Sequence, residues 1–193
     1  MRKVVHHITP GHSDKNFGKS INQLIEKLPE DDWICLRDID TMPLDHRKFF
    51  AQCETLAKEN KADIISCMTN RIGIKYQQHN GEVSDNFDIL HHMKIADELY
   101  QEFGCQVEIV DNRVTLAGFF MLFSKKTWLK CGRFKEGAIQ INGAFLDYIF
   151  SMAARRRGMT LGVAKGIYIF HLYRAWVENT VHKNTRTEYQ HLL

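Results

Sequence analysis

Apolar and polar residues follow two different periods along this chain of 193 residues, and each period predicts one kind of secondary structure. Runs of consecutive apolar residues predict buried strands, whereas apolar residues recurring every three or four positions predict helices that bury one face. The first pattern occurs at residues 3–9, 33–36, 62–68, 106–110, 114–123 and, as one or two strands, 161–174. The second pattern occurs at residues 15–28, 45–60, 91–104, 125–132 and 144–158.

Residues with strong end preferences mark where several of these helices begin and stop. Asp14 is a candidate N-cap of the first helix and Pro29 follows its end, while Gly104 and Gly158 are placed to end two later helices. Residues 69–86, by contrast, are polar and have no sustained period. Loops of this length in compact domains are often lids or binding loops, which makes this segment a candidate binding loop.

Strands that alternate with helices predict a single α/β domain over residues 1–193, with helices on both faces of a mostly parallel sheet. In sheets of this kind, ligands bind outside the carboxyl ends of the strands. We therefore expect functional side chains at positions that directly follow a strand.

Composition narrows the class of partner. The 44% hydrophobic content suffices for one buried core, and five widely spaced cysteines in apolar surroundings are typical of reduced core residues in a cytoplasmic protein. The formal charge of +3 comes from interspersed Lys and Arg, with a basic run only at residues 155–157, which suits a small anionic ligand better than nucleic acid. The first residues do not resemble a signal peptide, and no apolar run reaches the ~18 residues of a membrane span.

Two carboxylates follow the strand predicted at 33–36. If strand geometry continues, Asp38 and Asp40 share one face of the chain and Arg37 points to the other. Two like charges a few ångströms apart repel by about 1 kcal/mol in water and by several times more in a partly buried cleft. A divalent cation that also binds substrate phosphates would relieve this repulsion. The alternative is structural: Asp40 caps the turn at 41–44, and Asp38 is solvated at a strand end.

Three stretches, taken in their order and spacing, resemble the family 2 glycosyltransferases, which have the GT-A fold. Residues 15–44 are similar to that family's Asn-x-Gly motif, a downstream Asn and a strand followed by Asp-x-Asp. Residues 117–136 are similar to its apolar Gly-containing strand, basic-aromatic helix and Gly-x-Phe turn. Residues 145–174 resemble the segment with the catalytic Asp, an Arg-x-x-x-Gly helix end and a strand ending in His.

This resemblance implies roles for individual residues. Asp38 and Asp40 would bind the metal and the diphosphate of a sugar nucleotide, with His171 as a third ligand of Mn²⁺ or Mg²⁺. Asp147 would be the general base that deprotonates the acceptor hydroxyl in an inverting enzyme. Further candidates for substrate contact are Asn16, Gly18, Asn22, Gly118, Arg155, Arg174 and Trp176.

The same residues also have structural interpretations. Asp147 lies in the first turn of a predicted helix, where the helix dipole favours a carboxylate. His171 can be an ordinary residue at a strand end, and Gly118 a close-packed strand glycine. The basic run at 155–157 can be a solvated helix end. The start of the first helix and its exposed face can account for Asn16, Gly18 and Asn22.

The chain departs from the family pattern in two places. Only residues 9–15 separate the first strand from Asn16, so a strand-helix unit that contributes to the nucleotide-base pocket is missing. Leu146 stands where the family has an acidic residue before the catalytic Asp. These departures leave open a minimal enzyme, a chain completed by a partner or a homodimer, and a relative that binds without catalysis.

The sequence therefore predicts a shortened GT-A-like domain that acts as a metal-dependent, inverting glycosyltransferase. It would move a sugar from a UDP- or GDP-sugar to a hydroxyl group of a saccharide or other acceptor. Two alternatives remain. One is a non-catalytic binding or assembly module of the same fold, and the other is a metal-dependent phosphohydrolase or nucleotidyltransferase that uses the same carboxylates.

Overall fold

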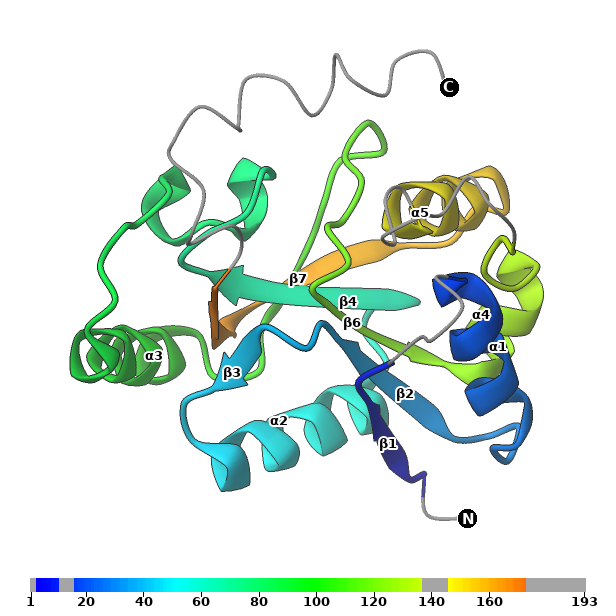
Figure 1. Ribbon diagram of the computed structural model, residues 1–193, viewed down its shortest axis with the longest axis horizontal. Helices are drawn as coiled ribbons and strands as arrows, with labels where there is room; N and C mark the ends of the chain where they lie inside the picture. The colour runs from blue at the N-terminus through cyan, green and yellow to red at the C-terminus, as the bar shows by residue number, and fades with distance from the viewer. Residues whose placement is uncertain (1–2, 11–15, 137–145, 173–193) are drawn as a thin grey trace.

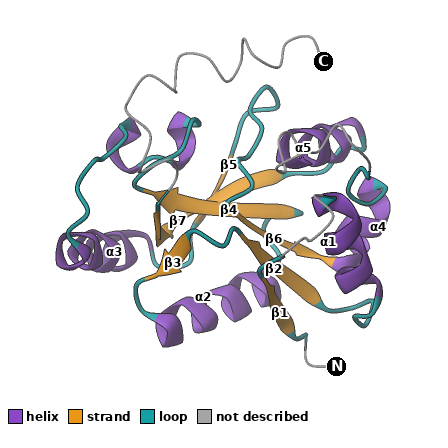
Figure 2. Ribbon diagram, viewed as in Figure 1, coloured by secondary structure: helices purple, strands orange, loops and turns teal. Residues whose placement is uncertain are grey.

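The computed structural model describes residues 3–10, 16–136 and 146–172, which form a mixed β-sheet with helices packed on both faces (Figure 1). The strands are β1 (Val5–Ile8), β2 (Trp33–Arg37), β3 (Thr41–Pro43), β4 (Ile64–Thr69), β5 (Val107–Ile109), β6 (Phe120–Ser124) and β7 (Leu161–His171). The α-helices are α1 (Phe17–Glu26), α2 (His46–Glu59), α3 (Ile89–Phe103), α4 (Lys125–Cys131) and α5 (Leu146–Arg156). Two short 3-10 helices, η1 (Lys75–Gln77) and η2 (His79–Gly81), lie within the polar segment after β4 (Figure 2).

The strands lie in the order β1-β2-β6-β4-β7-β3, and β5 also pairs with β7. Parallel pairs join β1 to β2 and β4 to β7, whereas β6 runs antiparallel to both β2 and β4. Both β3 and β5 run antiparallel to β7. The strands β1, β2, β4 and β7 thus share one direction and β3, β5 and β6 have the other. The predicted α/β class is confirmed, and the predicted parallel character of the sheet is confirmed in part.

Two apolar clusters cover the two faces of the sheet. On one face, α2 packs its Phe49 and Leu56 among side chains of β2, β4 and β6. On the other face, α1, α4 and α5 contribute Ile25, Trp128 and Phe150 (Figure 1). The predicted core positions of the cysteines are confirmed for Cys35, Cys53, Cys67 and Cys131, and Cys105 is half-buried. Among the described helices, none is both long and apolar enough to cross a membrane.

The helices begin and end at residues that cap them, by a side-chain hydrogen bond to a free backbone amide or by a backbone conformation that stops the helix. The side chain of Asn16 accepts a hydrogen bond from the amide of Lys19 at 3.1 Å and caps α1. The N-cap is therefore Asn16 and not Asp14, which lies outside the described residues. Gly104 ends α3 as predicted, with φ = 55°, a backbone conformation that L-residues rarely adopt.

The strand predicted at 114–123 is shorter in the structure, because side chains from other elements take its first backbone amides. The donor and acceptor pairs are Leu116 N with Ser151 Oγ, Ala117 N with Gln77 Oε1, and Gly118 N with Asp147 Oδ2. An amide that donates to a side chain is not available for a β-ladder. The strand therefore begins at Phe120.

The segment predicted as one or two final strands forms β7 alone, with an irregularity in its middle. Its register against β4 shifts, since Cys67 pairs with Ala164 while the next residue, Met68, pairs with Tyr168. Gly166 lies within this shift, where an added Cβ would stand 2.1 Å from the carbonyl oxygen of Gly104. The close approach of the chain after α3 therefore requires glycine at this position.

Candidate metal centre

The topology brings five chain segments to one edge of the sheet. Because β2, β4 and β7 point the same way, their carboxyl ends meet at this edge, and the oppositely directed β3 and β6 begin there. The residues delivered are Asp38 after β2, Asn70 after β4, His171 at the end of β7, Asp40 before β3 and Phe119 before β6. This edge is where ligands are expected in such sheets.

A turn, and not a continuous strand, brings the two aspartates together. β2 ends at Arg37, and Thr41 donates to the carbonyl oxygen of Asp38 from its backbone amide at 3.3 Å and from its hydroxyl at 2.7 Å. The carbonyl oxygen of Asp40 accepts from the amide of Leu172 at 3.0 Å, which ties the turn to the end of β7. The sequence predicts that Asp38 and Asp40 lie on one face of a strand. They lie in a turn instead, and the turn also places their carboxylates close together.

Asp38, Asp40 and His171 can converge on one cation. Each offers one ligand atom, and these atoms lie within 4.8 Å of one another. Ligands on opposite sides of an octahedral ion with bonds of about 2.1 Å are about 4.2 Å apart, so small side-chain movements suffice. Two carboxylates and one imidazole suit Mn²⁺ or Mg²⁺ by their chemistry. The residues present therefore fit the predicted metal.

The imidazole of His171 is oriented from three sides. Its Nδ1 lies 3.0 Å from the carbonyl oxygen of Arg71, which can only accept, so Nδ1 carries a proton. The ring of Phe119 stacks on it with centroids 5.2 Å apart and an interplanar angle of 19°. In the neutral ring, the lone pair is then on Nε2, which lies 3.3 Å from Asp40 Oδ1. The lone pair of Nε2 and the carboxylate of Asp40 would repel each other. A metal ion between them, or a proton on Nε2, makes their short distance favourable.

Asn70 fixes the backbone of His171. Its side-chain oxygen accepts from the amide of His171 at 2.7 Å, and its side-chain nitrogen donates to the carbonyl of His171 at 3.2 Å. The sequence interpretation missed Asn70, Arg71 and Phe119. The available signal for the first two was their position directly after the buried strand β4, at the edge where Asp38 was expected.

The electrostatics of the centre separate the two aspartates. Asp38 keeps contact with solvent, yet desolvation by the protein around it raises its pKa to about 7. His171 opposes this shift, and the carboxylates of Asp40 and Asp147 add to it. Burial also raises the pKa of Asp40, but the hydrogen bond and charge of His171, together with a backbone hydrogen bond, outweigh burial, so that the pKa lies below its ordinary value. Asp40 is therefore ionised and Asp38 is partly protonated near neutral pH.

The raised pKa of Asp38 predicts that the metal-free protein loses stability as the pH rises. The folded state has a pKa of about 7 and the ordinary value is 3.8, so between them the folded state binds a proton that the unfolded state releases. The free energy of unfolding should fall from about pH 4 to about pH 7. Urea unfolding across this range should show a shallower fall in Asp38→Asn, and an unchanged slope would contradict the assignment.

Asp147 lies in the first turn of α5, close enough to Asp38 for its carboxylate to raise the pKa of Asp38. Its Oδ2 accepts from the amide of Gly118 at 2.8 Å, and its Oδ1 accepts from the amide of Tyr148 at 2.7 Å. Burial raises the pKa of Asp147, and these two amides offset part of the rise. An added Cβ on Gly118 would stand 2.8 Å from Cβ of Asp147. Gly118 is therefore the position that lets the carboxylate approach, and packing explains the glycine without an acceptor contact.

Asn22 has a structural role in the core. Its side-chain nitrogen donates to Phe134 O at 2.9 Å and to Glu136 Oε1 at 2.8 Å. Its side-chain oxygen accepts from Phe134 N at 3.0 Å and from the indole of Trp128 at 3.2 Å. These bonds use both donors and both acceptor positions of the amide, which leaves none for the predicted nucleotide contact. Asn16 caps α1, and Gly18 is buried. The three residues of this region that are predicted to contact the nucleotide therefore have structural roles within the protein.

Arg155 is likewise engaged by the protein. Its guanidinium donates to the carbonyl oxygens of Val110 and Asp111, both at 2.9 Å, and to Asn112 Oδ1 at 3.1 Å. These contacts hold the loop after β5 against α5 and give Arg155 a structural role, while its contact with a diphosphate stays a prediction. The two remaining candidates, Arg174 and Trp176, lie outside the described residues.

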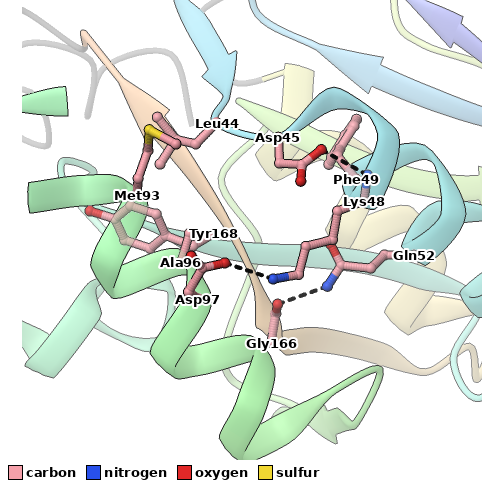
Figure 3. A pocket seen from close by; sticks show the side chains of 10 residues that line it. All are labelled: Leu44, Asp45, Lys48, Phe49, Gln52, Met93, Ala96, Asp97, Gly166 and Tyr168. Carbon is pink, nitrogen blue, oxygen red and sulfur yellow. Dashed lines mark hydrogen bonds and ion pairs between the residues drawn. The ribbon is translucent and has the colours of Figure 1, made fainter. Parts of the chain in front are cut away.

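A cavity between α2, α3 and β7 is not part of this centre (Figure 3). Its volume of about 70 Å³ has room for a few water molecules and not for a sugar nucleotide. Lys48 forms an ion pair with Asp97 at 2.8 Å beside it, and Gln52 donates to the carbonyl of Gly166 at 2.9 Å (Figure 3). These bonds join the two helices and β7, so we interpret the cavity as a packing gap.

No protein-family model matches the chain, and comparison with curated proteins gives no significant match. The functional interpretation consequently depends on the geometry and chemistry of the centre formed by Asp38, Asp40, His171 and Asp147.

Proposed function

We propose that this protein is a metal-dependent glycosyltransferase with a shortened GT-A-like fold. Asp38, Asp40 and His171 would hold a divalent cation together with the diphosphate of a sugar nucleotide, and Asp147 would act on the acceptor. The observation that supports the proposal most directly is the convergence of two carboxylates and an oriented imidazole within 4.8 Å at the carboxyl edge of the sheet.

The proposed reaction needs one group that stabilises the departing diphosphate and another that deprotonates the acceptor hydroxyl. A bound Mn²⁺ or Mg²⁺ would neutralise negative charge on the departing diphosphate. Asp147 takes the proton from the acceptor hydroxyl while that oxygen forms a bond to the anomeric carbon and the bond to the diphosphate breaks. Burial raises the pKa of Asp147 above its ordinary value, which strengthens the carboxylate as a base, and the amides of Gly118 and Tyr148 orient it.

Binding of a nucleoside diphosphate with metal tests the proposal. Calorimetric titration of UDP and of GDP should give saturable binding of at least one of them in the presence of Mn²⁺ and much weaker binding in the presence of EDTA. Asp40→Asn, which removes one charge from a half-buried position, should weaken the metal-dependent part. Absence of metal-dependent binding for both nucleotides would refute the proposal.

A non-catalytic module of the same fold is the second candidate. It is favoured by the short link between β1 and α1, in which residues 9–16 leave no space for a further strand and helix. This candidate predicts nucleotide binding without turnover. A phosphohydrolase or nucleotidyltransferase using the same carboxylates would instead release sugar phosphate or pyrophosphate, and the products of any turnover therefore separate it from a glycosyltransferase.

A further inference from the structure

A second cavity, of about 650 Å³, lies between the polar segment after β4 and the C-terminal half of α3. Its lining includes Met68 of β4, Leu99 and Phe103 of α3, Glu108 of β5 and Lys165 of β7. None of the residues of the candidate metal centre lines it. Its volume falls within the range of about 300 to 1,000 Å³ that is common for small-molecule sites.

The wall formed by η1 and η2 is held in place before any ligand arrives. Gln77 is fully buried, donates to Ser66 Oγ and accepts from the amide of Ala117 at 2.7 Å. The following 3-10 helix, η2, contains two residues with positive φ, 56° at Asn80 and 71° at Gly81. A wall fixed in this way needs little ordering on binding, which favours affinity.

One part of the lining of this cavity is apolar. Met68 and Leu99 belong to the main core cluster, and Phe103 packs against it. Burial lowers the pKa of His79, so that its imidazole is neutral near pH 7 and adds no charge to the wall. A ligand that reaches this surface must therefore carry an apolar portion.

The charged side chains of the lining, Lys75, Lys165 and Glu108, carry an excess of positive charge. Lys165 lies 3.0 Å from Glu108, so these two charges offset each other. Lys75 is exposed, and within the described part of the chain no acidic side chain forms an ion pair with it. One exposed ammonium group of the lining thus remains outside any ion pair among the described residues, beside apolar side chains, and it complements a single negative charge.

We propose that this cavity binds an amphipathic anion, namely an apolar body that carries one phosphate or carboxylate group. The apolar body contacts Met68, Leu99 and Phe103, and the anionic group pairs with Lys75. The site is separate from the candidate metal centre, and the inference does not depend on the proposed function.

Calorimetric titration with octyl phosphate, octanoate and octanol tests this inference on the full chain. Both anions should bind saturably at one site, and the one that binds more tightly identifies the preferred head group. Octanol should bind at least about tenfold more weakly, because its hydroxyl cannot form an ion pair with an ammonium group. Shortening the alkyl group of the tighter-binding anion should weaken binding about fourfold for each methylene removed. Each methylene that is lost can no longer be transferred from water to the apolar side chains of the cavity.

Matched charge reversals on the surface complete the experiment. Lys75→Glu should weaken binding of the tighter anion by about tenfold or more, whereas Lys94→Glu, on an exposed position of α3 outside the cavity, should leave it unchanged. Three results would each overturn the inference: no saturable binding of either anion, equal binding to Lys75→Glu and wild type, or affinity that is independent of alkyl length.

Discussion

Replacing His171 by alanine is expected to weaken Mn²⁺ binding by about 100-fold or more. Removal of a group that merely supports a ligand costs about 10- to 100-fold in metal affinity, and loss of the ligand itself should reach at least the upper end of that range. His171 is buried and its ring contacts the carbonyl of Arg71, so the variant also removes that contact. The free Mn²⁺ signal in electron paramagnetic resonance measures the affinity.

Two further variants separate ligation from folding in this experiment. Asp40→Asn keeps the shape of a half-buried side chain and should lose Mn²⁺ affinity without a comparable loss of stability. His91→Ala, on an exposed position of α3, should bind Mn²⁺ as the wild type does. Thermal unfolding identifies any variant that is not folded. Wild-type affinity in both folded His171→Ala and Asp40→Asn would show that the ion binds elsewhere.

Asp147→Asn should reduce turnover by about 100-fold or more while leaving metal binding largely intact. The amide keeps the size of the side chain, but it cannot accept the proton of an acceptor hydroxyl, and loss of a general base has an effect of this order. Release of nucleoside diphosphate from the bound donor is the measurement. The same titration of Mn²⁺ as above shows whether the centre is preserved.

Asp111→Asn provides the matched control for this substitution. It makes the same chemical change on an exposed carboxylate that contacts Arg113, outside the candidate centre. Turnover should stay at the wild-type level. If Asp147→Asn also retains full turnover, Asp147 is a structural acceptor for the amides of Gly118 and Tyr148, and the general base must be sought elsewhere.

The periodic helices could be predicted from the sequence because burial of one face dictates their pattern. Five helical patterns correspond to α1 through α5, and Gly132, in a left-handed conformation, ends α4 at the position where its pattern ends. The apolar residues of β2 and β4 are consecutive because both faces of these strands are buried, each in one of the two apolar clusters. Local preference and tertiary packing agree in these elements.

Short and interrupted strands could not be predicted in the same way. β3 contains three residues, one of them Pro43, and exists because it pairs with the end of β7 through Thr41 and His171. The start of the strand predicted at 114–123 is lost to Gln77, Ser151 and Asp147, all from other parts of the chain. No local pattern encodes partners at such separations.

The pattern of residues along the chain predicts the helices, the long buried strands and the position of Asp38 and Asp40 directly after one of these strands. The fold brings both carboxylates to His171, and Asp38 within electrostatic reach of Asp147, because parallel and antiparallel strands deliver distant segments to one edge. It also decided that Asn22 and Arg155 serve the core and a loop, since their hydrogen bonds are made to segments more than 40 residues away. Spacing along a chain does not specify such contacts, whereas the register of the sheet does.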